Sequence, residues 1–169
     1  DPSSRTTRYT FSNKFDTSES MLLRTDYYDG DSSTAIVRSE ANTYALPPAT
    51  GWSWPWPQYE GRSPVLAVNT GQTGQLAPLS LAVTTESGNT FTHSVNSFDA
   101  FANPASVTRS NNIAGQVAVT EVASYLNDQA NWVLSLPVET DNPSTGEVES
   151  HNTYNTGTDT LASRARFGQ

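Results

Sequence analysis

A short tryptophan-rich segment carries the most distinctive chemistry in the sequence. Residues 51–59 read Gly-Trp-Ser-Trp-Pro-Trp-Pro-Gln-Tyr. Alternate side chains of an extended chain share one face, and proline, which lacks an N–H donor, favours an edge strand or a surface loop. We therefore take Trp52, Trp54, Trp56 and Tyr59 as the candidate binding residues. Three uses fit them: a cap over one end of the core, a protein interface, or a platform for sugar rings.

Residues that carry most enzyme chemistry are sparse. The chain has no cysteine and two histidines, His93 and His151, both in alternating segments typical of surface strands. No serine lies in the glycine pattern of a nucleophile elbow, and no phosphate-binding glycine loop is present. The two histidines lack the spacing of a zinc site. We therefore expect a protein that is not an enzyme, with no catalytic residue, no metal and no cofactor.

Three aspartates gather near one predicted turn. Asp26, Asp29 and Asp31 surround Gly30, and calcium prefers such oxygen-rich loops. The order of acids typical of a calcium loop is missing, as is its trailing glutamate. The pattern thus favours an ordinary hairpin turn without a bound ion.

The charge of the chain limits its partners. Seventeen acidic residues oppose nine basic ones, which leaves a net charge of −8. Nucleic acids and anionic membranes both attract cationic surfaces, so we expect neither as a partner. No apolar run approaches the length of a membrane span, which predicts no membrane insertion. The chain starts at Asp1 without a methionine, and we expect one domain over residues 1–169, excised from a longer protein.

Short alternating segments, separated by Gly, Asn, Asp and Pro, predict an all-β fold. Their number, roughly nine to eleven, is typical of an antiparallel β-sandwich or jelly roll with at most one short helix. The expected strands cover residues 8–11, 21–28, 34–38, 64–68, 79–85, 90–95, 132–138, 147–154 and 160–167. Residues 113–126 fit both a strand and a helix; we expect a strand to Val122 and one helical turn at 123–127. Trp132, at the start of an apolar strand, is expected in the core, and no internal repeat is evident.

In style, the whole chain resembles the protruding surface domains of small icosahedral RNA-virus capsid proteins, such as nodavirus-like, tombusvirus-like and tetravirus-like particles. The resemblance rests on short strands rich in Ser, Thr and Asn, a single lysine, no cysteine and no catalytic constellation. It implies a spike on the virion surface that self-associates as a dimer or trimer and attaches to a host receptor. An extracellular carbohydrate-binding module, whether a lectin-like adhesin or an enzyme-appended domain, is the alternative suggested by the indoles. A phage or bacterial fibre tip is a third.

Overall fold

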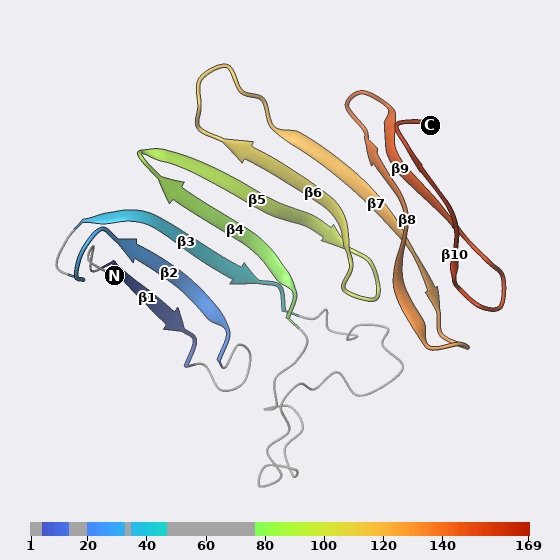
Figure 1. Ribbon diagram of the computed structural model, residues 1–169, viewed down its shortest axis with the longest axis horizontal. Helices are drawn as coiled ribbons and strands as arrows, with labels where there is room; N and C mark the ends of the chain where they lie inside the picture. Colours follow the sequence, from blue (N-terminus) through green and yellow to red (C-terminus); the bar gives the residue numbers. More distant parts are fainter. Residues whose placement is uncertain (1–4, 14–19, 33–34, 47–76) are drawn as a thin grey trace, which may run out of the picture.

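The computed structural model describes residues 5–13, 20–32, 35–46 and 77–169, which form one β-sheet (Figure 1). The described residues contain no helix, and so none that could cross a membrane. The strands are β1 Thr6–Phe11, β2 Leu22–Tyr28, β3 Ile36–Tyr44, β4 Leu79–Glu86, β5 Asn89–Phe98, β6 Pro104–Asn111, β7 Val119–Asp128, β8 Val133–Asn142, β9 Glu147–Tyr154 and β10 Leu161–Arg166.

The sheet is an antiparallel meander. Its ten strands lie side by side in the order of the sequence, from β1 at one edge to β10 at the other (Figure 1). Contacts between strands join each strand to its neighbours in the sheet, and one further pair touches only slightly. Tight turns make this path possible. Ser87 and Gly88, between β4 and β5, both have positive φ, 51° and 78°, as a two-residue type I′ hairpin turn requires.

The predicted all-β antiparallel fold is confirmed, whereas the predicted sandwich or jelly roll is not. A sandwich places a second sheet over one face, and its strands then alternate between buried and exposed residues. The central strands lack this alternation: β4, β5 and β8 are half-buried or exposed on both faces. Among the described residues, only Tyr28, Ala77, Ala102 and Val107 are buried hydrophobic residues. The described strands therefore form a single layer.

In the middle of the chain one expectation is wrong and one strand was missed. Residues 123–127 continue β7 and form no helical turn. They pair with β8, so the cross-strand ladder overrides the helical spacing of the apolar residues. The strand β6 was not predicted at all, because Val107 is its only large aliphatic residue. Serine and threonine fill the alternate positions in β6, which removes the apolar periodicity on which strand prediction depends.

Trp132 is not a core residue. It lies in the turn before β8, with 63% of its surface exposed and a φ of 59°. Asp128 organises this turn, because its Oδ1 accepts hydrogen bonds from the backbone N–H groups of Ala130 (2.9 Å) and Asn131 (3.1 Å). An aspartate that bonds to the backbone in this way stabilises a turn. The turn includes Trp132, and the strand begins one residue later.

One structural device occurs twice in the sheet, in the β2–β3 and β8–β9 hairpins. In the first, Asn42 Nδ2 and Tyr44 Oη both donate to the carbonyl of Leu22, at 3.1 and 2.9 Å. In the second, Asn152 Nδ2 and Tyr154 Oη both donate to the carbonyl of Pro137, each at 2.7 Å. We call each arrangement an Asn-Thr-Tyr clamp.

Both clamps close a β-bulge. The register with the preceding strand shifts directly after Leu22 in β2 and directly after Pro137 in β8. A bulge interrupts the backbone ladder, and the two side chains donate hydrogen bonds to the carbonyl beside it. The tripeptide Asn-Thr-Tyr at 42–44 and 152–154 is the sequence signal of this repetition, which our sequence analysis missed. The two clamped hairpins lie six strands apart.

Candidate functional site

The predicted binding residues lie outside the part of the chain that the structure describes. Trp52, Trp54, Trp56 and Tyr59 belong to the segment 47–76, as does the strand expected at 64–68. Their role as a core cap, an interface or a sugar platform stays a prediction. The described residues offer other candidates: the histidines, the aspartate turn, two shallow hollows and the faces of the sheet.

The two histidines lie in separate strands. His151 on β9 is directly opposite Glu139 on β8, and its Nδ1 is 2.9 Å from Glu139 Oε2. Both side chains are close to half exposed, so this contact contributes at most about 1 kcal/mol. His93 on β5 is opposite Arg109 on β6. The described hydrogen bonds join neither histidine to a serine hydroxyl, and the expectation of a protein without catalysis stays a prediction.

The aspartate cluster is divided between a strand and a turn. Asp26 lies within β2, is buried, and accepts a 2.7 Å bond from Arg24 Nε. Asp29 follows the strand, and its Oδ1 lies 3.7 Å from Arg5 Nε. Nowhere in the described ranges do three or more His, Asp or Glu residues form a group that could hold a metal ion.

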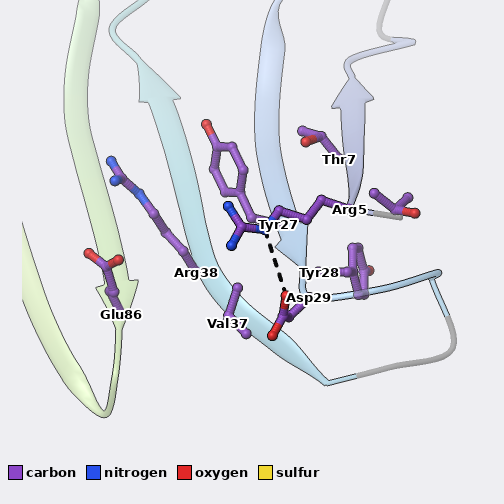
Figure 2. Close-up of a pocket in the computed structure, with 9 residues that line it drawn as sticks. Arg5, Thr7, Tyr27, Tyr28, Asp29, Val37, Arg38 and Glu86 are labelled. Carbon is purple, nitrogen blue, oxygen red and sulfur yellow. Dashed lines mark ion pairs between the residues drawn. The ribbon is translucent and has the colours of Figure 1, made fainter. Parts of the chain in front are cut away.

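A hollow of about 390 Å³ lies where β1 to β4 meet at one end (Figure 2). Figure 2 shows Arg5 joined to Asp29, and Arg38 between Tyr27 and Glu86. The Arg38 guanidinium stacks over the Tyr27 ring, 5.6 Å from its centroid, and pairs with Glu40 at 2.6 Å. Each cation here already has an anion, so the hollow has little net charge with which to select an ionic ligand.

A second hollow, of about 500 Å³, lies over β4 to β7 beside Phe91, His93 and Arg109. Arg109 forms an ion pair with Glu121 across the sheet. The hydrogen bond that Arg109 donates to the Glu121 carboxylate raises the pKa of Arg109 above its usual value, so the guanidinium stays charged and paired. This hollow, like the first, is lined by charges that are neutralised within the protein.

The two faces of the central strands differ in charge. Paired residues in adjacent strands project to the same face, so the register assigns each side chain to one face. One face of β3 to β7, which we call the charged face, carries Arg38, Glu40, Glu86, Arg109 and Glu121. The other, which we call the hydroxyl face, carries no charged residue in the paired rows that define it. Its cross-strand rows are Ser39–Thr85–Thr90, Ala41–Val83–Thr92–Ser110, Thr43–Leu81–Ser94–Thr108–Thr120 and Ser106–Val122.

Hydrogen bonds within the hydroxyl face join side chains of neighbouring strands. Thr108 and Thr120 share a 2.8 Å bond between their hydroxyls. Asn96 Nδ2 donates to Thr108 Oγ1 at 2.8 Å and to Ser106 Oγ at 3.2 Å. These groups are thus partly satisfied inside the protein, which lowers the cost of removing water from the face. Small, uncharged, mutually bonded side chains give a surface suited to close packing.

Sequence reasoning missed this face because its residues carry no motif. The one signal was compositional: few charges and abundant Ser and Thr, which only the strand register resolves into two different faces. Comparison of the chain with protein-family models, with curated proteins and with solved structures finds no match, so its function is argued from its own residues.

Proposed function

We propose that the protein is a structural β-scaffold: a single-layer wall of antiparallel hairpins that supports and contacts partner chains. One observation carries the proposal. The described strands follow one another through the sheet in chain order, and each contacts essentially its neighbours alone. In an architecture of this kind each hairpin contacts only the hairpins next to it. Its stability is therefore approximately a sum of the contributions of single hairpins and of their contacts with neighbours.

The repeated clamp supports the same proposal. The β2–β3 and β8–β9 hairpins use one set of hydrogen bonds to hold two different bulges. The clamp therefore stabilises two separate hairpins of the sheet, and its residues are not gathered around a single site. Enzymes, in contrast, bring groups from separate elements together around one reacting atom.

The virion-surface hypothesis is one special case of such a scaffold. It requires a sheet that self-associates and meets a receptor, and it stays a prediction, as do the carbohydrate-binding and fibre-tip alternatives. The carbohydrate alternative rests on Trp52, Trp54 and Trp56, outside the described residues.

A truncation tests the scaffold. Removal of residues 147–169 deletes β9 and β10, the last two strands of the meander. We expect the shortened chain to retain the β-sheet circular dichroism of the other strands and to unfold at a lower temperature, because among the described strands only β8 packs on the deleted pair. Hydrogen exchange on the full chain should show protection rising from the outer strands to the centre.

The opposite result would contradict the scaffold. If the truncated chain loses all cooperative structure, the protein depends on a shared core like that of an ordinary globular domain. Uniform exchange protection from β1 to β10 would lead to the same conclusion. Removal of residues 160–169 alone, which deletes only β10, is the milder control and should lower stability less.

A further inference from the structure

We infer that the hollow over β4 to β7 is a binding site for a sugar ring of a neutral oligosaccharide. Its volume of about 500 Å³ lies within the range of small-molecule sites in proteins. Side chains of three neighbouring strands on the charged face meet there with the loop between β6 and β7. The inference goes beyond the scaffold by assigning a ligand to one place on the sheet. It rests on residues other than the tryptophans of segment 51–59.

An exposed aromatic ring lines the hollow. Phe91 on β5 is 42% exposed, whereas phenylalanine is usually buried. Thr84 on β4 and Asn111 on β6 lie opposite Phe91 in the adjacent strands, so the ring has a hydroxyl on one side and an amide on the other. A phenyl ring offers a flat apolar surface, and the C–H face of a sugar ring stacks on such a surface.

Uncommitted hydrogen-bonding groups lie around the aromatic ring. His93 lines the hollow two residues further along β5, and Gln116 lines it from the loop. In the described part of the chain, no hydrogen bond uses the His93 ring, the Gln116 side-chain amide or Asn111 Nδ2. A neutral imidazole and a side-chain amide each donate and accept, as sugar hydroxyls do. One flat apolar ring beside free donors and acceptors favours a sugar over a wholly apolar ligand.

The charges at the hollow favour a neutral ligand. Arg109 lies opposite His93 and forms an ion pair with Glu121. An anionic sugar would have to compete with Glu121 for this guanidinium. A cationic ligand finds no counter-charge, because the described residues that line the hollow include no acid.

The loop at the border of the hollow is fixed to the sheet by Asn112. The backbone N–H of Asn112 donates to the carbonyl of Thr90 at 3.2 Å, and Asn112 Oδ1 accepts from the Thr90 N–H at 2.8 Å. Asn112 Nδ2 also donates to the carbonyl of Gly88 at 3.4 Å. The start of the loop is thus joined to β5 and to the turn before it. A site held in place before the ligand arrives loses less conformational freedom on binding.

Titration with uncharged hexasaccharides (cellohexaose, xylohexaose and maltohexaose) tests the site. We expect at least one of them to bind saturably in calorimetry and to shift the NMR signals of the His93 ring. Phe91→Ala should weaken this binding at least about tenfold, because the stacking surface is lost. Gln116→Ala, in the exposed loop, should weaken it about threefold. Phe11→Ala removes another exposed phenylalanine, on β1, and should bind like the unmodified chain.

A variant of the tryptophan segment separates the two places where a sugar could bind. The chain with Trp52→Ala, Trp54→Ala and Trp56→Ala should keep the binding. Its loss in this variant, with the β-sheet circular dichroism retained, would overturn the inference. Undiminished binding in Phe91→Ala would also overturn it, and so would the absence of saturable binding by any of these sugars. Deletion of residues 147–169 removes none of the lining residues, so the scaffold and the sugar site can fail separately.

Discussion

The two clamped hairpins use the same side chains in different surroundings. Asn42 is half-buried, with its clamp beside the edge strand β1. Asn152 is only 4% exposed, and its Oδ1 also accepts a 3.0 Å bond from Arg164 Nε on β10. The second clamp therefore links three strands, β8, β9 and β10, where the first links two. The comparison shows that one local sequence contributes different amounts of stability according to the strands around it.

Each of the two hairpins also carries an aspartate at an equivalent position, and the two aspartates differ in their hydrogen bonds. Each stands four residues after the clamped carbonyl: Asp26 in β2 and Asp141 in β8. Asp26 is buried and bonded by Arg24. Asp141 has a buried Oδ1 for which the described structure offers no hydrogen-bond donor. A buried carboxylate oxygen without a donor costs stability, so we expect the two equivalent positions to act on stability in opposite directions.

The largest effect is expected from breaking the second clamp. Asn152→Ala removes a buried amide that bonds both Pro137 and Arg164, and should lower the free energy of unfolding by about 2–3 kcal/mol. Asn42→Ala removes one bond at a more exposed site and should cost about 1 kcal/mol. Urea unfolding monitored by circular dichroism measures both. Equal losses would show that the two clamps are energetically equivalent, contrary to the comparison.

The aspartates should give an intermediate effect of opposite sign. Asp26→Asn weakens a charge-assisted bond in a buried position and should cost about 1–2 kcal/mol. Asp141→Asn replaces an acid that has an unsatisfied buried oxygen, and should be neutral or slightly stabilising. The same urea titration compares the two at neutral pH. A marked loss of stability in Asp141→Asn, matching that of Asp26→Asn, would mean that the Asp141 carboxylate has a stabilising partner.

The smallest expected effect is a pH-dependent loss of stability, which involves the strand before each clamp. Tyr125 in β7 is paired with Pro137, where Phe11 in β1 is paired with Leu22. Burial, and secondarily the charge of Asp99, raise the pKa of the Tyr125 hydroxyl above 10.0. A raised pKa stabilises the folded state below the unfolded pKa, and that contribution is lost as the pH rises through the folded value.

We therefore expect stability to fall above pH 10, and Tyr125→Phe to reduce that fall. At neutral pH the variant also loses the 3.1 Å bond from Tyr125 Oη to the carbonyl of Pro104, at a cost of about 1 kcal/mol. Thermal unfolding of both proteins between pH 8 and about 11 measures the difference. Phe11→Tyr, at the exposed equivalent position, is the control and should leave the pH dependence of stability unchanged. Parallel curves for the unmodified protein and Tyr125→Phe would contradict the prediction.

Much of the secondary structure could be predicted from the sequence, because it depends on local patterns. Alternation and turn residues correctly predicted strands such as β2, β4 and β9 with nearly their observed ends. Apolar alternation did not predict β6, where polar residues take the place of apolar ones. It gave the wrong structure at residues 123–127, where the apolar spacing fits both a strand and a helix. Asn-Thr-Tyr, printed twice in the sequence, was missed because its meaning depends on a carbonyl in the preceding strand.

By itself, the sequence determined an acidic, cysteine-free, all-β chain whose strands are short and closely connected. Only the tertiary structure decided that the described strands lie in one layer, since apolar alternation does not specify what covers a face. It also decided the division of charge between the two faces. Alternation assigns the side chains of one strand to two sides, and only the register between strands shows which sides coincide. The hydroxyl face is a property of five strands together, each of which alone reads as an ordinary polar strand.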